Sequence, residues 1–465
     1  MRLVIVGGGI AGLTAAHRAV EISRERGTAL ELTVLEARDR LGGTIETEHA
    51  GGFLVETGPD SFLSEKPWGL ALCRRIGLES RLVGTDDRFR RVFVWFGKRL
   101  HPVPDGFQLL APTRLTPFVT SSLFSWPGKL RMALDVILPR GGGGDESLGA
   151  FVRRRLGREA LERIAQPLVA GIYTADPDEL SLLATMPRFV ELERRERSLI
   201  VGLWKASRKA PAASTSGARW SLFVSLAGGM GELIAALASR LPSDAVRLKH
   251  RVGGIERRGA HWRVTTEEAG AIDADAVIVA TETHAASRLL RYVDPPLATM
   301  LEMIPYASSA TVSLGYRRAD VPHPLDGFGF VVPRAEHRDL LACTFSSVKY
   351  PGRAPERHVL IRCFVGGALN AAALERSDDE IVERVRRELG EALGITAAPM
   401  LTRVARHPAS MPQYAVGHLT TVETIERRLA AIPGLLLAGG GYRGVGIADC
   451  VRSGEAAADA AFARR

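Results

Sequence analysis

A glycine-rich turn between two predicted elements near the start of the chain constrains the fold most. Residues 1–6 form an apolar, β-branched run that predicts a buried strand. The segment Gly7-Gly8-Gly9-Ile10-Ala11-Gly12 follows and fits the pattern G-x-G-x-x-G, and residues 13–16 begin a helix pattern. A second apolar run, residues 30–35, ends at Glu36. This order of strand, glycine turn, helix, strand and acid predicts a dinucleotide-binding unit.

Each glycine of this turn has a predicted role. Gly7 permits the tight turn, Gly9 lets the backbone approach a pyrophosphate, and Gly12 lets the helix pack on the strand. The N-terminus of the helix then offers unpaired N–H groups and a partial positive charge to the phosphates. Glu36 is expected to accept hydrogen bonds from a ribose hydroxyl, and its charge disfavours a 2′-phosphate.

Composition indicates a large globular protein. The chain has 465 residues, of which 46% are hydrophobic, so two or three domains are expected. Its four cysteines (Cys73, Cys343, Cys363 and Cys450) are scattered, which predicts a reducing compartment, no disulfide framework and no metal site. No later stretch reaches the roughly 18 to 20 uninterrupted apolar residues of a membrane span. We therefore expect a cytoplasmic protein whose membrane contact, if any, is peripheral to the inner face of the cell membrane.

The chain is basic, with a formal net charge of +9 and a pI of about 9.7. One interpretation is a solvated, arginine-rich surface, and the other is an anionic partner. No helix-turn-helix, RNP or zinc pattern accompanies the charge, so no nucleic acid is expected. An acidic small molecule or an anionic membrane surface fits better.

The order of the predicted elements indicates an α/β (mixed α+β) fold with a nucleotide-binding domain of discontinuous segments. A second glycine-rich turn from strand to helix lies near the C-terminus, so the substrate region is inserted between the two turns. A hairpin over residues 88–104, a helix over 378–393 and an exposed loop over 207–219 are also predicted. The predicted division is a nucleotide-binding domain (1–88, 220–290 and 415–465), a substrate-binding domain (89–104 and 291–414) and a helical subdomain (105–219).

The helical subdomain contains a segment with two interpretations. Residues 127–139 mix cationic and apolar positions at helical spacing. A peripheral helix lying in a membrane interface is one interpretation. A helix that turns its apolar face to the core of the substrate region is the other, and the pattern favours it.

Further glycines extend the first motif. A second pair, Gly42 and Gly43, follows Glu36, and a late turn runs from Gly439 to Gly446. This combination resembles the flavoprotein oxidases, a superfamily that includes amine oxidases, carotenoid desaturases and protoporphyrinogen oxidases. The resemblance implies that the extended first motif holds FAD rather than NAD. The sequence departs from the pattern at Thr44, where many members carry arginine, so that phosphate contact is expected to be weaker or made by the backbone.

Motifs in the middle of the chain narrow the resemblance. The stretches Gly58-Pro59-Asp60-Ser61-Phe62-Leu63, Leu100-His101-Pro102-Val103-Pro104 and Gln166-Pro167-Leu168-Val169-Ala170-Gly171-Ile172-Tyr173 are similar to bacterial porphyrinogen oxidases. So is the turn that ends at Cys450. The resemblance runs nearly end to end, and it identifies the chain as a member of the bacterial coproporphyrinogen III oxidase and protoporphyrinogen oxidase family.

The resemblance assigns cofactor contacts to matching positions. Cys450 lies after the last glycine turn rather than before it, so we expect FAD to be bound non-covalently. Val252 is expected near the adenine, and Val445 to Ile447 near the isoalloxazine at a helix N-terminus. The full set of expected FAD contacts is Gly7, Gly8, Gly9, Ile10, Ala11, Gly12, Glu36, Ala37, Gly42, Gly43, Thr44, Gly58, Pro59, Asp60, Ser61, Val252, Gly439, Val445, Gly446 and Ile447.

The resemblance also implies an activity: oxidation of a porphyrinogen to a porphyrin in heme biosynthesis, with six electrons passing through flavin to O2 and three H2O2 formed. The Gly-Pro-Asp-Ser-Phe-Leu variant and the basic charge favour coproporphyrinogen III, and protoporphyrinogen IX stays open. No catalytic base is assigned. Lys66 is a candidate propionate anchor or electrostatic aid, against a solvated helix N-terminus, and Tyr173 is a candidate pocket residue, against a core aromatic.

Two other classes remain as alternatives: an amine oxidase or carotenoid desaturase, and a non-enzymatic binding protein resembling a GDP-dissociation inhibitor. The intact glycine turns at both ends argue against the second. The expected partners are the porphyrinogen and O2, with handover of product to a ferrochelatase-type enzyme.

Overall fold

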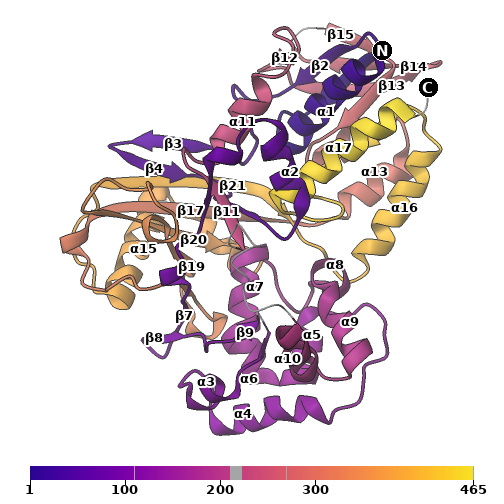
Figure 1. The fold of residues 1–465 in the computed structure, drawn as a ribbon. Helices are drawn as coiled ribbons and strands as arrows, with labels where there is room; N and C mark the ends of the chain where they lie inside the picture. The colour runs from indigo at the N-terminus through magenta and orange to yellow at the C-terminus, as the bar shows by residue number, and fades with distance from the viewer. Residues whose placement is uncertain (109, 210–221, 269, 464–465) are drawn as a thin grey trace.

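Two large β-sheets and a helical part make up the molecule, and the chain passes between them several times (Figure 1). The structure is a computed structural model that describes residues 1–108, 110–209, 222–268 and 270–463. Among these residues, no helix is both long and apolar enough to cross a membrane.

Three separate parts of the chain build a five-stranded parallel sheet, because β1 and β2 come from the start, β12 and β16 from the middle and β22 from the end. All four neighbouring pairs run parallel. Parallel strands covered on both faces read as continuous apolar runs, as β1 and β16 do. The predicted α/β fold with a discontinuous nucleotide sheet is confirmed. The strand order is β12 (Val246–Arg247), β2 (Glu31–Leu35), β1 (Arg2–Val6), β16 (Ala276–Val279) and β22 (Leu435–Leu437).

One face of this sheet is covered by the first and last long helices, α1 (Ile10–Arg26) and α17 (Ile447–Ala463), which lie side by side (Figure 1). A Cβ atom on Gly454 would come within 2.2 Å of the Ala11 carbonyl oxygen, so only glycine allows this close approach. The short helices α2 (Pro67–Arg75) and α11 (Gly231–Ala238) complete the same apolar cluster.

The other face of the parallel sheet packs against an antiparallel meander and three helices. Val4 and Val277 of the sheet share an apolar cluster with Trp262 of the meander. The nucleotide sheet is therefore buried on both sides, as parallel sheets require. These elements are β13 (Val252–Arg258), β14 (His261–Thr266), β15 (Gly270–Ala274), α12 (Thr283–Leu290), α13 (Pro295–Glu302) and α16 (His418–Ala430).

The second large sheet has seven strands and is antiparallel except where β18 pairs with β7. The predicted hairpin is confirmed as β7 and β8, and it joins strands that lie more than 200 residues later. Helix α15 (Asp378–Leu393), which begins with a capping box at Ser377, covers one face. The strand order is β21 (Leu401–Pro412), β17 (Tyr306–Arg317), β20 (His358–Gly366), β19 (Leu340–Phe345), β18 (Gly329–Val331), β7 (Val92–Phe96) and β8 (Arg99–Pro102).

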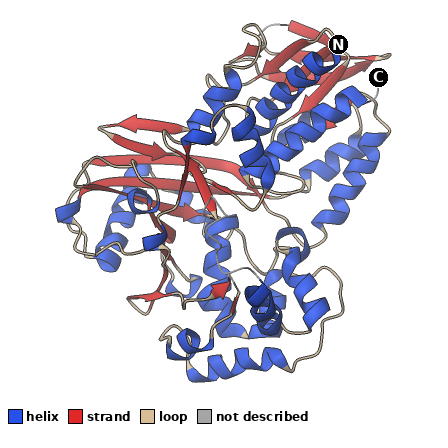
Figure 2. Ribbon diagram, viewed as in Figure 1, coloured by secondary structure: helices blue, strands red, loops and turns tan. Residues whose placement is uncertain are grey.

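Helices gather in the remaining part of the molecule (Figure 2). Their core includes Val331 and Ala342 of the seven-stranded sheet, so the two parts share one apolar cluster. A fully buried ion pair between Arg155 and Asp135 lies among them. The helices are α3 (Leu115–Thr120), α4 (Trp126–Ala133), α5 (Leu148–Leu156), α6 (Arg158–Ala160), the π-helical turn η4 (Leu161–Ala165), α7 (Gln166–Tyr173), α8 (Leu182–Thr185), α9 (Pro187–Glu196) and α10 (Leu199–Lys209).

Short elements connect these parts. The strands are β3 (Thr47–Ala50), β4 (Phe53–Glu56), β5 (Phe62–Leu63), β6 (Leu82–Gly84), β9 (Phe107–Gln108), β10 (Ala111–Pro112) and β11 (Phe223–Leu226). The helical turns are η1 (Glu79–Arg81), η2 (Asp87–Phe89), η3 (Leu134–Val136), α14 (Ser346–Lys349), η5 (Arg318–Asp320), η6 (Arg334–Glu336) and η7 (Ala371–Glu375).

Two local predictions need correction. Helix α10 continues to Lys209, so the predicted loop over 207–219 begins too early, and residues 210–219 lie outside the described residues. The predicted helix over 127–139 is shorter, because α4 ends at Ala133 and passes into the 3-10 turn η3. The division into three domains stays a prediction.

Candidate functional site

The first glycine turn has the geometry of a phosphate cradle. A Cβ on Gly12 would lie 1.9 Å from the Gly7 carbonyl oxygen, so the packing of α1 on β1 requires glycine. At Gly9, in contrast, a Cβ would meet nothing within 4 Å, so the space beside it is open. Gly9 is also the N-cap of α1 and provides no side-chain cap. The first N–H groups of α1 are thus left for an anion.

Glu36 is held in place by the backbone. Its side chain is buried, with 7% of the residue exposed. One carboxylate oxygen accepts a hydrogen bond from the Gly8 N–H at 2.7 Å, and the other accepts one from the Arg38 N–H at 2.8 Å. Each oxygen has a second lone pair. The carboxylate is therefore fixed at the end of β2 and can still accept from a ribose hydroxyl.

The second glycine pair lies directly against the first turn. The Gly42 N–H donates to the Gly8 carbonyl at 2.8 Å, and Gly42 pairs with Gly9 as an isolated parallel bridge. A Cβ on Gly43 would lie 3.4 Å from the Gly9 Cα. The second glycine pair, which the resemblance assigns to the FAD site, thus lies beside Gly9. Val252 is half-buried at the start of β13.

The turn after β4 is anchored on the seven-stranded sheet. The carbonyl oxygen of Thr57 accepts hydrogen bonds from Thr311 Oγ1 at 2.9 Å and from His407 Nε2 at 2.8 Å. Arg362, which is almost fully buried, donates to the same carbonyl and to that of Gly58. These bonds fix the segment 57–61 between the two sheets.

Position 58 also requires glycine, because a Cβ on Gly58 would lie 1.7 Å from the Thr44 carbonyl oxygen. Thr44 therefore contacts Gly58 through its backbone. Its departure from arginine leaves that packing intact.

Asp60 carries a buried charge in this turn. Its carboxylate pairs with Lys349 Nζ at 3.1 Å and accepts from Ser61 Oγ at 2.7 Å. Burial would raise the pKa of Asp60, but the charges of Lys349 and Arg362 outweigh it and lower the pKa to about 2. Asp60 is therefore an anion throughout the physiological range.

The late glycine turn leads into α17, and Asp449 lies in the first turn of that helix. A carboxylate near a helix N-terminus is favoured by the helix dipole. Asp449 pairs with Lys66 Nζ at 2.5 Å, and the side chains of Asp449 and Lys66 are 5% and 38% exposed. Lys66 is thus neither fully solvated nor unpaired. It joins the start of α2 to the start of α17.

Tyr173 is the last residue of α7. It packs at the edge of the apolar cluster of the helical part. Burial, together with the charge of Asp449, raises the pKa of Tyr173 to about 12. The charge of Asp449 therefore acts on both predicted site residues, because it pairs with Lys66 and contributes to the raised pKa of Tyr173.

Three residues near the candidate site were not predicted from the sequence: Asp449, Lys349 and Arg362. An acid in the first helical turn after a glycine loop was a usable signal for Asp449. No local signal in the sequence points to Lys349 or Arg362, because they lie about 300 residues from Asp60 along the chain.

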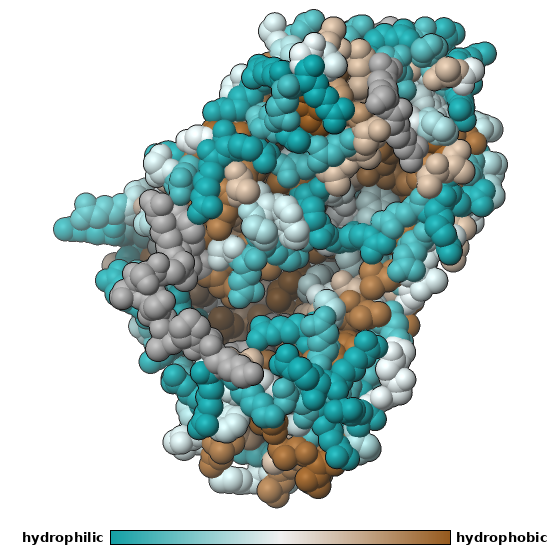
Figure 3. All heavy atoms as spheres, turned by 45° about the vertical axis from the view of Figure 1, so that its right-hand side comes forward, coloured by the Kyte–Doolittle hydropathy of each residue, from teal (hydrophilic) through white to brown (hydrophobic). Residues whose placement is uncertain are grey.

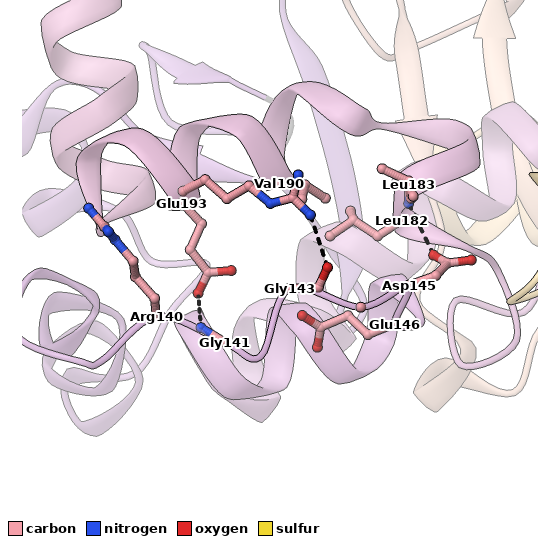
Figure 4. Close-up of a pocket in the computed structure, with 11 residues that line it drawn as sticks. Arg140, Gly141, Gly143, Asp145, Glu146, Leu182, Leu183, Val190 and Glu193 are labelled. Atoms are coloured by element: carbon pink, nitrogen blue, oxygen red, sulfur yellow. Dashed lines mark hydrogen bonds between the residues drawn. The ribbon is translucent and has the colours of Figure 1, made fainter.

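The molecule has a hollow on one face (Figure 3) and a separate small pocket in its helical part. Figure 3 shows one face hollowed at mid-height, with apolar residues visible in the hollow. A separate small pocket lies between the segment 140–146, α8 and α9, where the Gly141 N–H donates to Glu193 and Arg194 donates to the Gly143 carbonyl (Figure 4). Its lining shares no residue with the glycine turns. Among the residues described, no cluster of His, Cys, Asp or Glu could hold a metal ion.

Comparisons with known proteins agree with this geometry. The family model described as flavin containing amine oxidoreductase matches residues 10–461. The coproporphyrinogen III oxidase of Bacillus subtilis is 36% identical over 98% of this chain and 96% of its own length. Protoporphyrinogen oxidase 1 of Arabidopsis thaliana chloroplasts is 33% identical over 96% of this chain and 85% of its own length. A crystal structure of a candidate protoporphyrinogen oxidase from Exiguobacterium sp. 255-15 covers 100% of this chain and 99% of its own, with a TM-score of 0.88 and 33% identity.

The chain belongs to the flavin-containing amine oxidoreductase family. It is an oxidoreductase with FAD as its cofactor. The residues present fit this group, because the open side of Gly9, the uncapped start of α1 and the fixed carboxylate of Glu36 suit a pyrophosphate and a ribose. When bound, FAD supplies hydride acceptance and electron transfer to O2.

Proposed function

We propose that this chain oxidises coproporphyrinogen III to coproporphyrin III in heme biosynthesis, with O2 as the final acceptor. Six electrons leave the substrate in three two-electron steps, and three H2O2 are formed. The observation that carries the proposal is the similarity of nearly the whole chain to the Bacillus subtilis coproporphyrinogen III oxidase. The ion pair between Lys66 and Asp449, in the first turn of α17 after the late glycine turn, supports it.

Lys66 is proposed to bind a substrate propionate. An ammonium group has three donors, so Lys66 can keep its bond to Asp449 and still donate to a second carboxylate. Its side chain is 38% exposed and can be reached from outside. Coproporphyrinogen III has four propionates and protoporphyrinogen IX has two, so a cationic site favours the former.

Tyr173 is proposed to line the pocket as a neutral phenol. With a pKa raised to about 12, it keeps its proton at physiological pH. We assign no side-chain base, because the pyrrole N–H protons can be lost to water. The proposed FAD contacts are those that the sequence predicts, and they stay predictions.

Protoporphyrinogen IX is the second candidate substrate. The observation that favours it is the 33% identity with the Arabidopsis thaliana protoporphyrinogen oxidase over 96% of the chain. Removal of the same six hydrogens makes the two reactions chemically equivalent at the ring, so only side-chain recognition separates them.

An aerobic porphyrin fluorescence assay on the purified yellow protein tests the proposal with each substrate. We expect a rise with both, a higher kcat/KM for coproporphyrinogen III, and three H2O2 for each porphyrin formed. A higher kcat/KM for protoporphyrinogen IX would select the second candidate. No protein-dependent rise with either substrate, despite bound FAD, would leave an amine or polyene oxidase as the remaining class.

We further propose a cytoplasmic location with peripheral contact to the inner face of the cell membrane. The helical part exposes an apolar patch, which forms the brown area at the foot of Figure 3. Such a concentration of exposed apolar side chains is typical of a surface that binds a partner or a membrane. The patch consists of Leu115 (72% exposed), Trp126 (64%), Leu130 (68%), Leu134 (44%), Val136 (49%) and Ile137 (71%).

Co-sedimentation with phosphatidylglycerol vesicles tests the membrane contact. The wild type is expected to sediment with the vesicles, and the double variant Leu130→Glu/Ile137→Glu to remain in solution. Met303→Glu changes an equally exposed apolar residue on another surface and serves as the control. Equal sedimentation of the three proteins would refute the contact. Handover of the porphyrin to a ferrochelatase-type enzyme completes the proposed set of partners.

A further inference from the structure

The loop that leads into α17 is closed by a side chain from another part of the chain. The hydroxyl of Tyr414 donates a hydrogen bond to the Gly440 carbonyl at 2.6 Å and accepts one from the Gly444 N–H at 2.7 Å. Tyr414 is only 2% exposed. One hydroxyl thus fixes the separation of two backbone groups that lie four residues apart.

His418 holds the middle of the same loop. Its Nε2 lies 2.8 Å from the Tyr442 carbonyl, and because a carbonyl can only accept, the imidazole must donate there. Burial lowers the pKa of His418, so the ring is neutral. The ring also stacks on Tyr414, with centroids 3.9 Å apart and planes 13° from parallel. Residues 440, 442 and 444 are therefore all held by one stacked pair.

The backbone of this loop would otherwise be free to adopt many conformations. Gly439 and Gly444 both have φ of +127°, a region that is open essentially to glycine alone. Val445 to Ile447, the proposed flavin contacts at the start of α17, follow directly. The direction of their N–H groups therefore depends on the bonds from Tyr414 and His418.

The other end of the segment 413–418 is tied to the helical part. The Tyr414 carbonyl accepts from the Ser181 N–H at 2.7 Å, and the Gly417 N–H donates to Asp145 Oδ2 at 2.9 Å. Gln413 Nε2 donates to the carbonyl of Tyr173 at 3.2 Å. One short segment thus contacts both the late glycine turn and the end of α7.

We propose that Tyr414 and His418 are positioning residues for the flavin-facing turn, and that the segment 413–418 sets its position relative to the end of α7. The role of these residues toward the flavin follows from the family, and their role toward the substrate rests on the proposed function. Neither residue needs to touch the substrate. Their effect passes through the backbone of residues 440–444.

Three variants test the proposal on the holoenzyme. Tyr414→Phe keeps the stacked ring and removes both hydroxyl bonds. His418→Leu removes the donor to Tyr442, whereas His418→Gln keeps an N–H that can donate there. Tyr316→Phe, a buried tyrosine of the seven-stranded sheet, is the matched control.

The readouts are the flavin absorption spectrum, the Kd for FAD, and kcat and KM. For Tyr414→Phe and His418→Leu we expect an altered flavin spectrum, a Kd for FAD weaker by about tenfold, and a lower kcat with KM nearly unchanged. His418→Gln is expected to recover most of the wild-type spectrum and affinity, and Tyr316→Phe to match the wild type.

A wild-type flavin spectrum and Kd in both Tyr414→Phe and His418→Leu would overturn the proposal. So would equal losses in His418→Gln and His418→Leu. If the wild type itself fails to oxidise porphyrinogens, the proposed function fails, while the spectrum and the Kd for FAD still decide the positioning role. If Tyr414→Phe does not fold, the two His418 variants give the same decision.

Discussion

Asp449 connects two elements of the candidate site, α17 and the start of α2. Its buried carboxylate lies at the favourable end of α17 and pairs with Lys66 from α2. A buried carboxylate that loses its closest cation is destabilised, because its desolvation is then offset less, although Arg452 stays 4.0 Å from Asp449. The ion pair is therefore both an anchor for α2 and a source of donors for an anionic substrate.

Replacement of Lys66 tests this dual role. We expect Lys66→Met to lower kcat/KM for coproporphyrinogen III by about tenfold or more, mainly through KM, because one charge-assisted hydrogen bond to a propionate is lost. Lys66→Arg should keep most of the activity, since a guanidinium can also bind two carboxylates. Steady-state kinetics of both variants give the answer, and an unchanged KM in Lys66→Met would rule out a propionate anchor.

Asp60 gives a pH-dependent prediction. Its pKa is about 2 in the folded chain and 3.8 when unperturbed, so folding is stabilised above pH 3.8 and this stabilisation is lost as the pH falls toward 2. The difference corresponds to about 2 kcal/mol. Asp60→Asn should therefore lower the free energy of unfolding by about this amount at pH 7 and by much less near pH 2. Denaturant titrations at the two pH values measure it, and an equal loss at both would contradict the ion-pair account.

At the scale of elements, the glycines of the candidate site are needed for two different reasons. Gly12 and Gly58 are required by the protein itself, because a Cβ at either would collide with a carbonyl oxygen. Gly9 is not, because no atom of the described residues lies within 4 Å of a Cβ there. Glycine at this position makes sense only if the backbone must come close to a ligand.

Gly9→Ala separates ligand binding from folding. The apo form should unfold within about 0.5 kcal/mol of the wild type, since φ is −73° and the added methyl group meets open space. The affinity for FAD should fall at least tenfold. Gly142→Ala, which also adds a methyl group in open space but lies in the helical part, is expected to leave both unchanged. Calorimetry of the apo protein with FAD titration is the measurement, and tight FAD binding by Gly9→Ala would place the pyrophosphate elsewhere.

At the scale of the whole molecule, the fold brings both ends of the chain to one cofactor site without a reactive cysteine. Cys450 is free and buried, and burial raises the pKa of its thiol to about 12, so it is a poor nucleophile. We expect acid precipitation to release all FAD into the supernatant. Flavin that stays with the pellet would indicate a covalent link and contradict this expectation.

The sequence predicted best what is encoded locally. The strand, turn and helix around Gly7 to Gly12 and the helix α15 depend on neighbouring residues, and both appeared in the expected places. The parallel pairing of β7 with β18 could not be predicted, because it joins residues more than 200 positions apart without any periodic signal. The partner of Lys66 was hidden for the same reason, since Asp449 lies 383 residues away.

Anaerobic mixing of the flavin-loaded protein with coproporphyrinogen III tests whether the porphyrinogen passes its electrons to the flavin. We expect rapid bleaching of the flavin absorbance, because each flavin accepts two of the six electrons, and then return of the yellow colour with a rise in porphyrin fluorescence when O2 is admitted. Flavin that stays oxidised in the presence of excess coproporphyrinogen III and protoporphyrinogen IX would contradict the account.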